Sequence, residues 1–278
     1  DTARVYMEAE HSFGNWLEKS GRREEVVILS KCGHPDAMWN KRVNEKEMRK
    51  DLKKSLEELK TDYIDIYMLH RDDPDTEVAV AVETFNAMHE EGNIGAFGAS
   101  NWTHTRIEEA NEYAYKHNLI PFSVSSPNFC LARQVEDPWG GGCVNISGPE
   151  NQEARAWYEK NQMPVIAYAS LGRGFFSGRM KSEYADHAGD YLDSFAMIGY
   201  ACSDNFERLR RCEIIAEKHG VTVAQIAMNW IFSHPLNIFA IASMSKADRM
   251  KANREALLLQ LSDEEIAYLD LETPEFCG

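Results

Sequence analysis

Polar side chains that can take part in acid–base chemistry stand directly after short apolar runs of this chain. Lys31 follows the run VVILS and His70 follows YIDIYML, while Ser100 and Asn101 follow IGAFGA. Because the carboxyl ends of parallel strands meet at one side of a sheet, these positions indicate the mouth of a catalytic site. A single lysine or histidine at a strand end is more often a structural group, so each one alone predicts little.

The apolar runs themselves are short and rich in β-favouring residues, as expected for strands that are buried on both faces. Six such strands are predicted, at residues 26–30, 63–69, 94–99, 122–125, 165–169 and 238–242. Amphipathic helical patterns separate them, at residues 44–59, 78–91, 105–117, 150–161 and 205–219. Strands that alternate with helices of this length predict an α/β fold with a parallel sheet and right-handed crossovers.

Local signals support two of the helix starts. Asn44 and Thr103 are predicted N-caps, and Glu47 lies three residues after Asn44, as in a capping box. Two segments break the alternation, residues 134–149 and 173–205, and both follow strand ends, where substrate loops are expected. Without repeats or a linker-like shift in composition, one domain over residues 1–278 is the simplest organisation.

Bulk composition excludes several function classes. The net charge of −15 disfavours nucleic acid and anionic lipid as partners, and no run is apolar and long enough for a membrane span. The six cysteines include no CxxC pair, which favours reduced thiols in a cytoplasmic protein. Neither the histidines nor the cysteines show the spacing of metal ligands, so no metal site is predicted.

Ordered motifs resemble those of aldo-keto reductases over essentially the whole chain. They are DTARVY, LSK, DYIDIYMLH and GASNW in the first half, then YASLGRGFFSG and SMSKADRMKAN. The resemblance implies a (β/α)8 TIM barrel and a nicotinamide-dependent oxidoreductase that interconverts an aldehyde or ketone with an alcohol. In that family DTA ends the second barrel strand, so we expect this chain to be N-terminally truncated, lacking the first one to two strands. An upstream or fused segment, or a second copy in a homo-oligomer, would then close the barrel.

The resemblance assigns a catalytic tetrad to Asp1, Tyr6, Lys31 and His70. Tyr6 would be the acid/base, because carbonyl reduction needs a proton on oxygen as well as a hydride on carbon. The ammonium of Lys31 would lower the tyrosine pKa from about 10, and Asp1 would keep Lys31 charged and in place. His70 would donate a hydrogen bond that strengthens as negative charge develops on the carbonyl oxygen.

The resemblance also assigns the cofactor contacts. Ser100 and Asn101 would bind the nicotinamide carboxamide and Tyr168 would stack on the ring, whereas Ser126 stands where relatives usually carry Gln. The remaining expected contacts are Ala169, Ser170, Leu171 and Arg173 in one loop, and Ser243, Ser245, Lys246, Arg249 and Asn253 in the phosphate segment. Arg249 favours NADP(H) over NAD(H), although Lys246 and Arg249 equally suit a solvated helix start.

Two other functions compete with this interpretation. One is a redox-sensing or scaffold protein of the same fold that binds cofactor with weak catalysis. The other is an unrelated barrel enzyme, such as a Schiff-base aldolase that uses Lys31. A sugar or polyol-derived substrate would find polar and stacking contacts near the strand ends, at Arg71, Asp72, Asp73, Trp102 and Trp139, although these equally suit ordinary loop surface.

Overall fold

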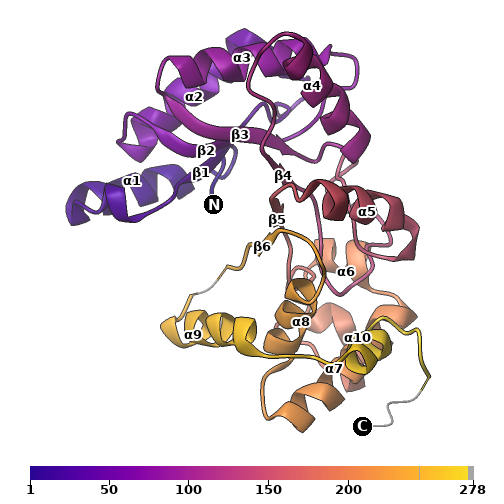
Figure 1. Cartoon of the computed structure of the whole chain (residues 1–278). Helices are drawn as coiled ribbons and strands as arrows, with labels where there is room; N and C mark the ends of the chain where they lie inside the picture. The colour runs from indigo at the N-terminus through magenta and orange to yellow at the C-terminus, as the bar shows by residue number, and fades with distance from the viewer. Residues whose placement is uncertain (244, 275–278) are drawn as a thin grey trace. The chain divides into compact units, whose positions relative to one another are not determined.

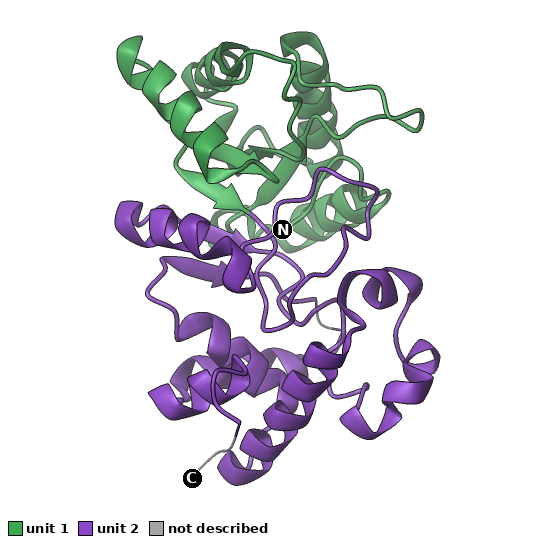
Figure 2. Cartoon of the chain, turned by 90° about the vertical axis from the view of Figure 1, so that its right-hand side faces the viewer, with its two compact units in different colours: residues 1–126 green, residues 127–278 purple. Residues whose placement is uncertain are grey.

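The computed structural model describes residues 1–243 and 245–274, and it divides into two compact units, Asp1–Ser126 and Pro127–Gly278 (Figure 2). Whether these two units form the one domain expected over residues 1–278 stays a prediction. No helix of the described residues combines the length and apolar character needed to cross a membrane. The five described cysteines are all free, and Cys277 lies outside the described residues.

Unit 1 alternates strands and helices. In chain order it contains α1 (Ala9–Ser20), the 3-10 turn η1 (Arg23–Glu25), β1 (Leu29–Cys32), α2 (Glu45–Leu59), β2 (Ile64–Leu69), α3 (Val78–Glu90), β3 (Ile94–Ser100), α4 (His104–Lys116) and β4 (Val124–Ser126). The four strands pair in sequence order and in parallel, and α2, α3 and α4 cover the same side of them (Figure 1). The register aligns Lys31 with Met68 and Ala99 with Ser125, so the strand ends meet at one edge as predicted.

Aromatic packing and one glycine hold the strands of unit 1 together. The rings of Phe85 and Phe97 stack at 5.4 Å between centroids, and Phe122 packs edge-on against both at about 6 Å. Gly98 of β3 lies so near β4 that a Cβ atom would come within 1.8 Å of the Val124 carbonyl oxygen. This close approach admits only glycine at that strand position.

Both predicted N-caps of unit 1 are confirmed. The Asn44 side chain accepts a hydrogen bond from the Glu47 amide at 3.0 Å, and Thr103 accepts one from the Arg106 amide at 3.2 Å. The reciprocal half of the predicted capping box was wrong. The Glu47 carboxylate instead accepts from Arg42 at 2.8 Å, because an ionic acceptor binds a guanidinium more strongly than a backbone amide.

Unit 2 contains β5 (Val165–Ala167) and β6 (Ile238–Ala240), which pair in parallel, so all six predicted strands are confirmed. Its helical elements are η2 (Pro149–Asn151), α5 (Gln152–Asn161), η3 (Ser182–Asp190), α6 (Ser194–Tyr200), α7 (Ser203–His219), α8 (Val223–Phe232), α9 (Ala247–Glu255), η4 (Ala256–Leu258) and α10 (Asp263–Leu269). The predicted loop at residues 173–205 thus contains η3 and α6.

Four helices of the described residues were missed in the sequence, namely α1, α6, α8 and α10, and α9 was considered only as a solvated helix start at Lys246 and Arg249. The helix α8 buries seven consecutive residues, from Gln225 to Ile231, and therefore shows no polar face for a periodicity argument to detect. Capping boxes begin α8, at Thr222 and Gln225, and α10, at Ser262 and Glu265. That signature was readable in the sequence.

Candidate active site

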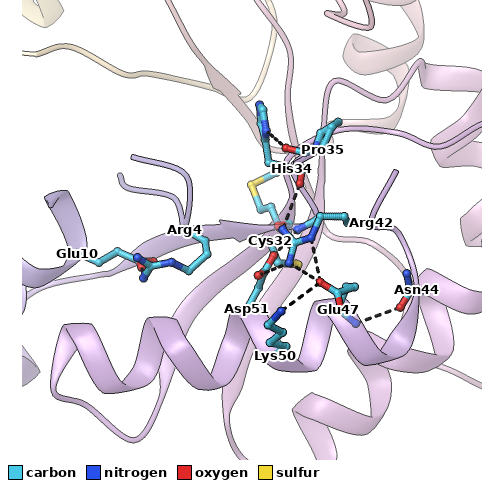
Figure 3. Close-up of polar contacts among 12 residues, drawn as sticks. Arg4, Glu10, Cys32, His34, Pro35, Arg42, Asn44, Glu47, Lys50 and Asp51 are labelled. Carbon is cyan, nitrogen blue, oxygen red and sulfur yellow. Dashed lines mark hydrogen bonds and ion pairs between the residues drawn. The ribbon is translucent and has the colours of Figure 1, made fainter. Parts of the chain in front are cut away.

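The first residues of the chain lie beside β1. The Thr2 amide donates to the Leu29 carbonyl at 2.8 Å, and the Arg4 amide donates to the Lys31 carbonyl at 3.0 Å. Side chains reinforce this pairing, because Arg4 forms an ion pair with the buried Glu10 (Figure 3). The Glu10 carboxylate also accepts from Ser30 Oγ at 2.6 Å. Residues 2–4 therefore pair with the backbone edge of β1.

This pairing brings the predicted tetrad together within unit 1. Lys31 Nζ, which is 3% exposed, donates to Asp1 Oδ1 at 2.5 Å and to the Thr2 carbonyl at 3.0 Å. The same ammonium lies 5.3 Å from the centroid of the Tyr6 ring. The Tyr6 ring in turn meets His70 edge-on, with 5.4 Å between centroids. Tyr6 is 43% exposed, while Lys31 and His70 are buried. Of these three side chains, the hydroxyl-bearing side chain of Tyr6 is therefore the one that is accessible.

Burial decides the charges in this cluster. It lowers the pKa of Lys31 to about 7, so desolvation outweighs the ion pair with Asp1. Burial and the ion pair with Asp1 thus act in opposite directions on the charge of Lys31, while the hydrogen bond from Nζ to Asp1 holds the ammonium in place. Burial, with the positive charge of Lys31, also holds the pKa of His70 well below its usual range. His70 is a neutral imidazole whose buried Nδ1 has no hydrogen-bond partner among the described residues.

Residues at the ends of β3 and β4 form a hydrogen-bond network with the backbone of His70. Asn101 Nδ2 donates to the His70 carbonyl at 3.0 Å and to Ser100 Oγ at 3.2 Å, and Ser100 Oγ donates to the Ser126 carbonyl at 2.8 Å. Asn101 adopts a positive φ of 60°, which turns the chain sharply at the end of β3. Ser100, Asn101 and Ser126 thus lie together, and their hydrogen bonds link the His70 backbone to the ends of β3 and β4.

A network that the sequence did not reveal holds the loop after β1. Arg42 donates to Asp51 Oδ1 of α2 at 2.7 Å and to the His34 carbonyl at 3.2 Å, while the Gly33 amide donates to Asp51 Oδ2 at 3.0 Å (Figure 3). This places the His34 ring 5.0 Å from the ring of His70. His34 was assigned no role in the sequence. Nothing in its spacing indicated this contact, which the loop creates only after folding.

Several of the residues suggested for sugar contacts are buried or form hydrogen bonds within the protein. Trp102 is only 1% exposed and lies under the guanidinium of Arg106, at 5.1 Å from its ring, so the expected stacking surface at Trp102 was wrong. Asp73 accepts from Thr76 at 2.9 Å, and Arg106 also donates to the Thr76 carbonyl. These contacts tie the loop after β2 to the start of α4.

Unit 2 carries the other predicted cofactor residues. Tyr168 follows β5, and its ring lies edge-on to Trp139 with 5.9 Å between centroids. Ser170 Oγ donates to the carbonyls of Ala167 and Ile241, at 3.1 and 2.9 Å, which joins the loop after β5 to the segment after β6. Arg173 pairs with Asp193 at 3.0 Å and lies 4.7 Å from the Phe195 ring. This loop, with positive φ at Ala169 and Arg173, is already ordered by protein contacts.

The predicted phosphate segment surrounds the N-terminus of α9. Lys246 is the N-cap residue without a side-chain cap, and Lys246 and Arg249 are exposed without an ion-pair partner in the described part of the chain. Ser243 and Ser245 precede the helix and Asn253 lies within it, whereas Met244 of the motif lies outside the described residues. Uncapped amide groups and two cations at a helix start favour a phosphate group.

Comparisons with known proteins agree with this geometry. The family model "Aldo/keto reductase family" matches residues 1–271. The chain is 25% identical over 272 residues to the aldo-keto reductase str7 of Strobilurus tenacellus, covering 96% of this chain and 74% of that protein. It is 26% identical over 281 residues to the aryl-alcohol dehydrogenase GME11368 of Pestalotiopsis microspora, covering 97% of this chain and 67% of that protein. It is 27% identical over 259 residues to the aldo-keto reductase yakc [NADP(+)] of Schizosaccharomyces pombe, covering 91% of this chain and 71% of that protein.

The fold comparison points the same way. The crystal structure of a thermostable aldo-keto reductase with the inhibitor epalrestat matches with a TM-score of 0.69 at 24% identity, covering 98% of this chain and 80% of that one. This likeness confirms the predicted barrel-type α/β fold. The family match overturns the alternative of an unrelated Schiff-base aldolase. The chain belongs to the aldo/keto reductase family and is an oxidoreductase of that family.

Proposed function

We propose that the chain interconverts a small aldehyde or ketone with its alcohol, using NADP(H), with Tyr6 as the acid/base. The observation that carries this proposal is the cluster in unit 1, where the buried Lys31 pairs with Asp1 and lies beside the accessible ring of Tyr6, with His70 against the same ring. The sequence resemblance assigned these four residues separately, and their assembly adds a geometric argument.

Each member of the cluster has a distinct task. Tyr6 delivers a proton to the carbonyl oxygen, and protonated Lys31 favours the phenolate that remains. Neutral His70 keeps one N–H that can donate to the same oxygen without adding charge. Asp1 and the Thr2 carbonyl orient the Lys31 ammonium. A bound NADPH supplies the hydride.

The residues of unit 2 fit this cofactor. The N-terminus of α9 offers amide groups without a side-chain cap, with Lys246 and Arg249 exposed beside it. Tyr168 and Ser170 lie in the ordered loop after β5, suited to the nicotinamide side. A relative named for NADP(+) and the guanidinium of Arg249, which suits a 2′-phosphate, favour NADP(H) over NAD(H).

Turnover tests the acid/base role. We expect Tyr6→Phe to bind NADPH like the wild type, measured by quenching of tryptophan fluorescence, while its oxidation of NADPH with an aryl aldehyde falls at least about 100-fold. Tyr115→Phe, at an exposed tyrosine of α4, is the matched control and should keep full activity. Wild-type binding without turnover would instead support the cofactor-binding scaffold, and no binding would contradict both functions.

Cofactor preference has its own test. Arg249→Gln should raise the Kd for NADPH about 10-fold and leave the Kd for NADH nearly unchanged, because only NADPH carries the 2′-phosphate. Arg254→Gln removes another cation of α9 and serves as control. An equal loss for both cofactors would show that Arg249 does not discriminate between them.

A further inference from the structure

A polar cavity lies entirely within unit 2, apart from the predicted cofactor residues. It has a volume of about 560 Å³ and lies between α5, α7, α8 and the residues that follow α10. Figure 1 labels these four helices. Its walls include Arg155 of α5, Arg208 of α7 and Trp230 of α8. None of the predicted catalytic or cofactor residues lines it.

Two guanidinium groups line this cavity and form no ion pair within 4.0 Å in the described residues, although Asp270 acts on both charges at longer range. Arg208 is 7% exposed, and its described bond goes to the neutral Asn205 Oδ1 at 3.2 Å. Arg155 donates to the carbonyls of Ile146 and Gly148, at 2.7 and 2.6 Å. Neither arginine has a carboxylate within 4.0 Å in residues 1–243 and 245–274. Burial lowers the pKa of both, so each charge is held at a cost in solvation.

Asp270 is the carboxylate that acts on both arginines. Asp270 lines the same cavity, and its Oδ1 accepts from Trp230 Nε1 at 3.0 Å. Burial raises the pKa of Asp270 to about 6. The interior therefore holds two positive charges against one carboxylate that becomes neutral in mildly acidic solution. At the rim, Arg133 is neutralised by Glu150 at 3.0 Å.

We propose that this cavity binds a small anion, a carboxylate or a tetrahedral oxyanion, whose oxygens bridge the guanidinium groups of Arg155 and Arg208. Planar guanidinium forks bind both kinds of anion in bidentate geometry. Such an anion supplies the missing counter-charge and stabilises the folded state as its concentration rises.

The charges around Asp270 predict how this binding depends on pH. The ionisable groups that line the cavity with it are Arg133, Arg155, Glu159, Arg208, His234 and Glu272. Burial holds the pKa of His234 below its usual range, and Glu159 and Glu272 are exposed at the rim. Protonation of Asp270 below about pH 6 removes the interior negative charge, so the anion binds more tightly in acid.

Calorimetric titration with sulfate and with succinate, at constant ionic strength set by chloride, tests the proposal. We expect saturable binding of at least one anion, weakened about fivefold or more by Arg155→Gln and by Arg208→Gln. Arg249→Gln is the matched control, because the start of α9 is the other place where an anion is expected to bind. Sulfate binding alone identifies a tetrahedral oxyanion, and succinate binding alone a carboxylate.

Two measurements keep the proposal falsifiable if an arginine variant fails to fold. Sulfate should bind wild type several-fold more tightly at about pH 5.5 than at about pH 7.5, and Asp270→Asn should bind tightly at both. No saturable binding up to about 50 mM of either anion would overturn the proposal. Loss of binding in Arg249→Gln but not in Arg155→Gln would also overturn it, and would leave the proposed cofactor site untouched.

Discussion

Replacing Lys31 by Met should abolish activity and also change how stability depends on pH. Burial lowers the folded-state pKa of Lys31 from 10.5 to about 7. Between these values the unfolded chain binds one proton more than the folded chain, so the free energy of unfolding of wild type rises with pH. Each unit of pH in this window contributes about 1.4 kcal/mol.

The magnitude follows from the two pKa values. At pH 7 about half of the folded chains have already released the proton, so the gain from pH 7 to pH 9 is about 2 kcal/mol. Lys31→Met has no ammonium to desolvate and loses this contribution, while its other titratable groups remain. The difference in unfolding free energy between the two proteins therefore shifts by about 2 kcal/mol over that range.

Urea unfolding followed by tryptophan fluorescence at pH 7 and pH 9 measures this shift, and NADPH oxidation measures activity. Lys116→Met, at an exposed lysine of α4, is the control and should follow wild type in both assays. Parallel pH dependences of Lys31→Met and wild type would refute the argument that burial controls this ammonium. Turnover by Lys31→Met within about 10-fold of wild type would refute its proposed role beside Tyr6.

Two further substitutions test the framework of unit 1. Gly98→Ala should cost about 3 kcal/mol of stability or more, because its Cβ would meet the Val124 carbonyl oxygen at 1.8 Å. Gly189→Ala, with open space around the added Cβ, is the control. Equal urea midpoints for the two variants would contradict the packing argument. Asp51→Asn should cost about 3 kcal/mol by leaving Arg42 with an incomplete partner. It should also lower kcat/KM, because the loop that sets His34 against His70 loosens. Unchanged kinetics beside lowered stability, with Asp190→Asn as control, would show that the loop network is only structural.

The strands and their order were predictable because their signal is local. Short β-favouring runs separated by amphipathic helices indicate parallel strands without knowledge of their partners, and Asn44 and Thr103 act on residues only three positions away. The helix α8 was missed for the converse reason. A helix that is buried on every side carries no alternation of polar and apolar residues.

The sequence by itself determined which residue types stand at the strand ends, and the resemblance of its motifs assigned Asp1, Tyr6, Lys31 and His70 their tasks. Only the tertiary structure decided their charges, since the pKa values of Lys31 and His70 depend on how far folding removes each group from water. The contact of His34 with His70 and the burial of the Arg208 guanidinium likewise arise from distant segments. Desolvation and contacts between distant segments are set by the folded packing, and no local pattern records them.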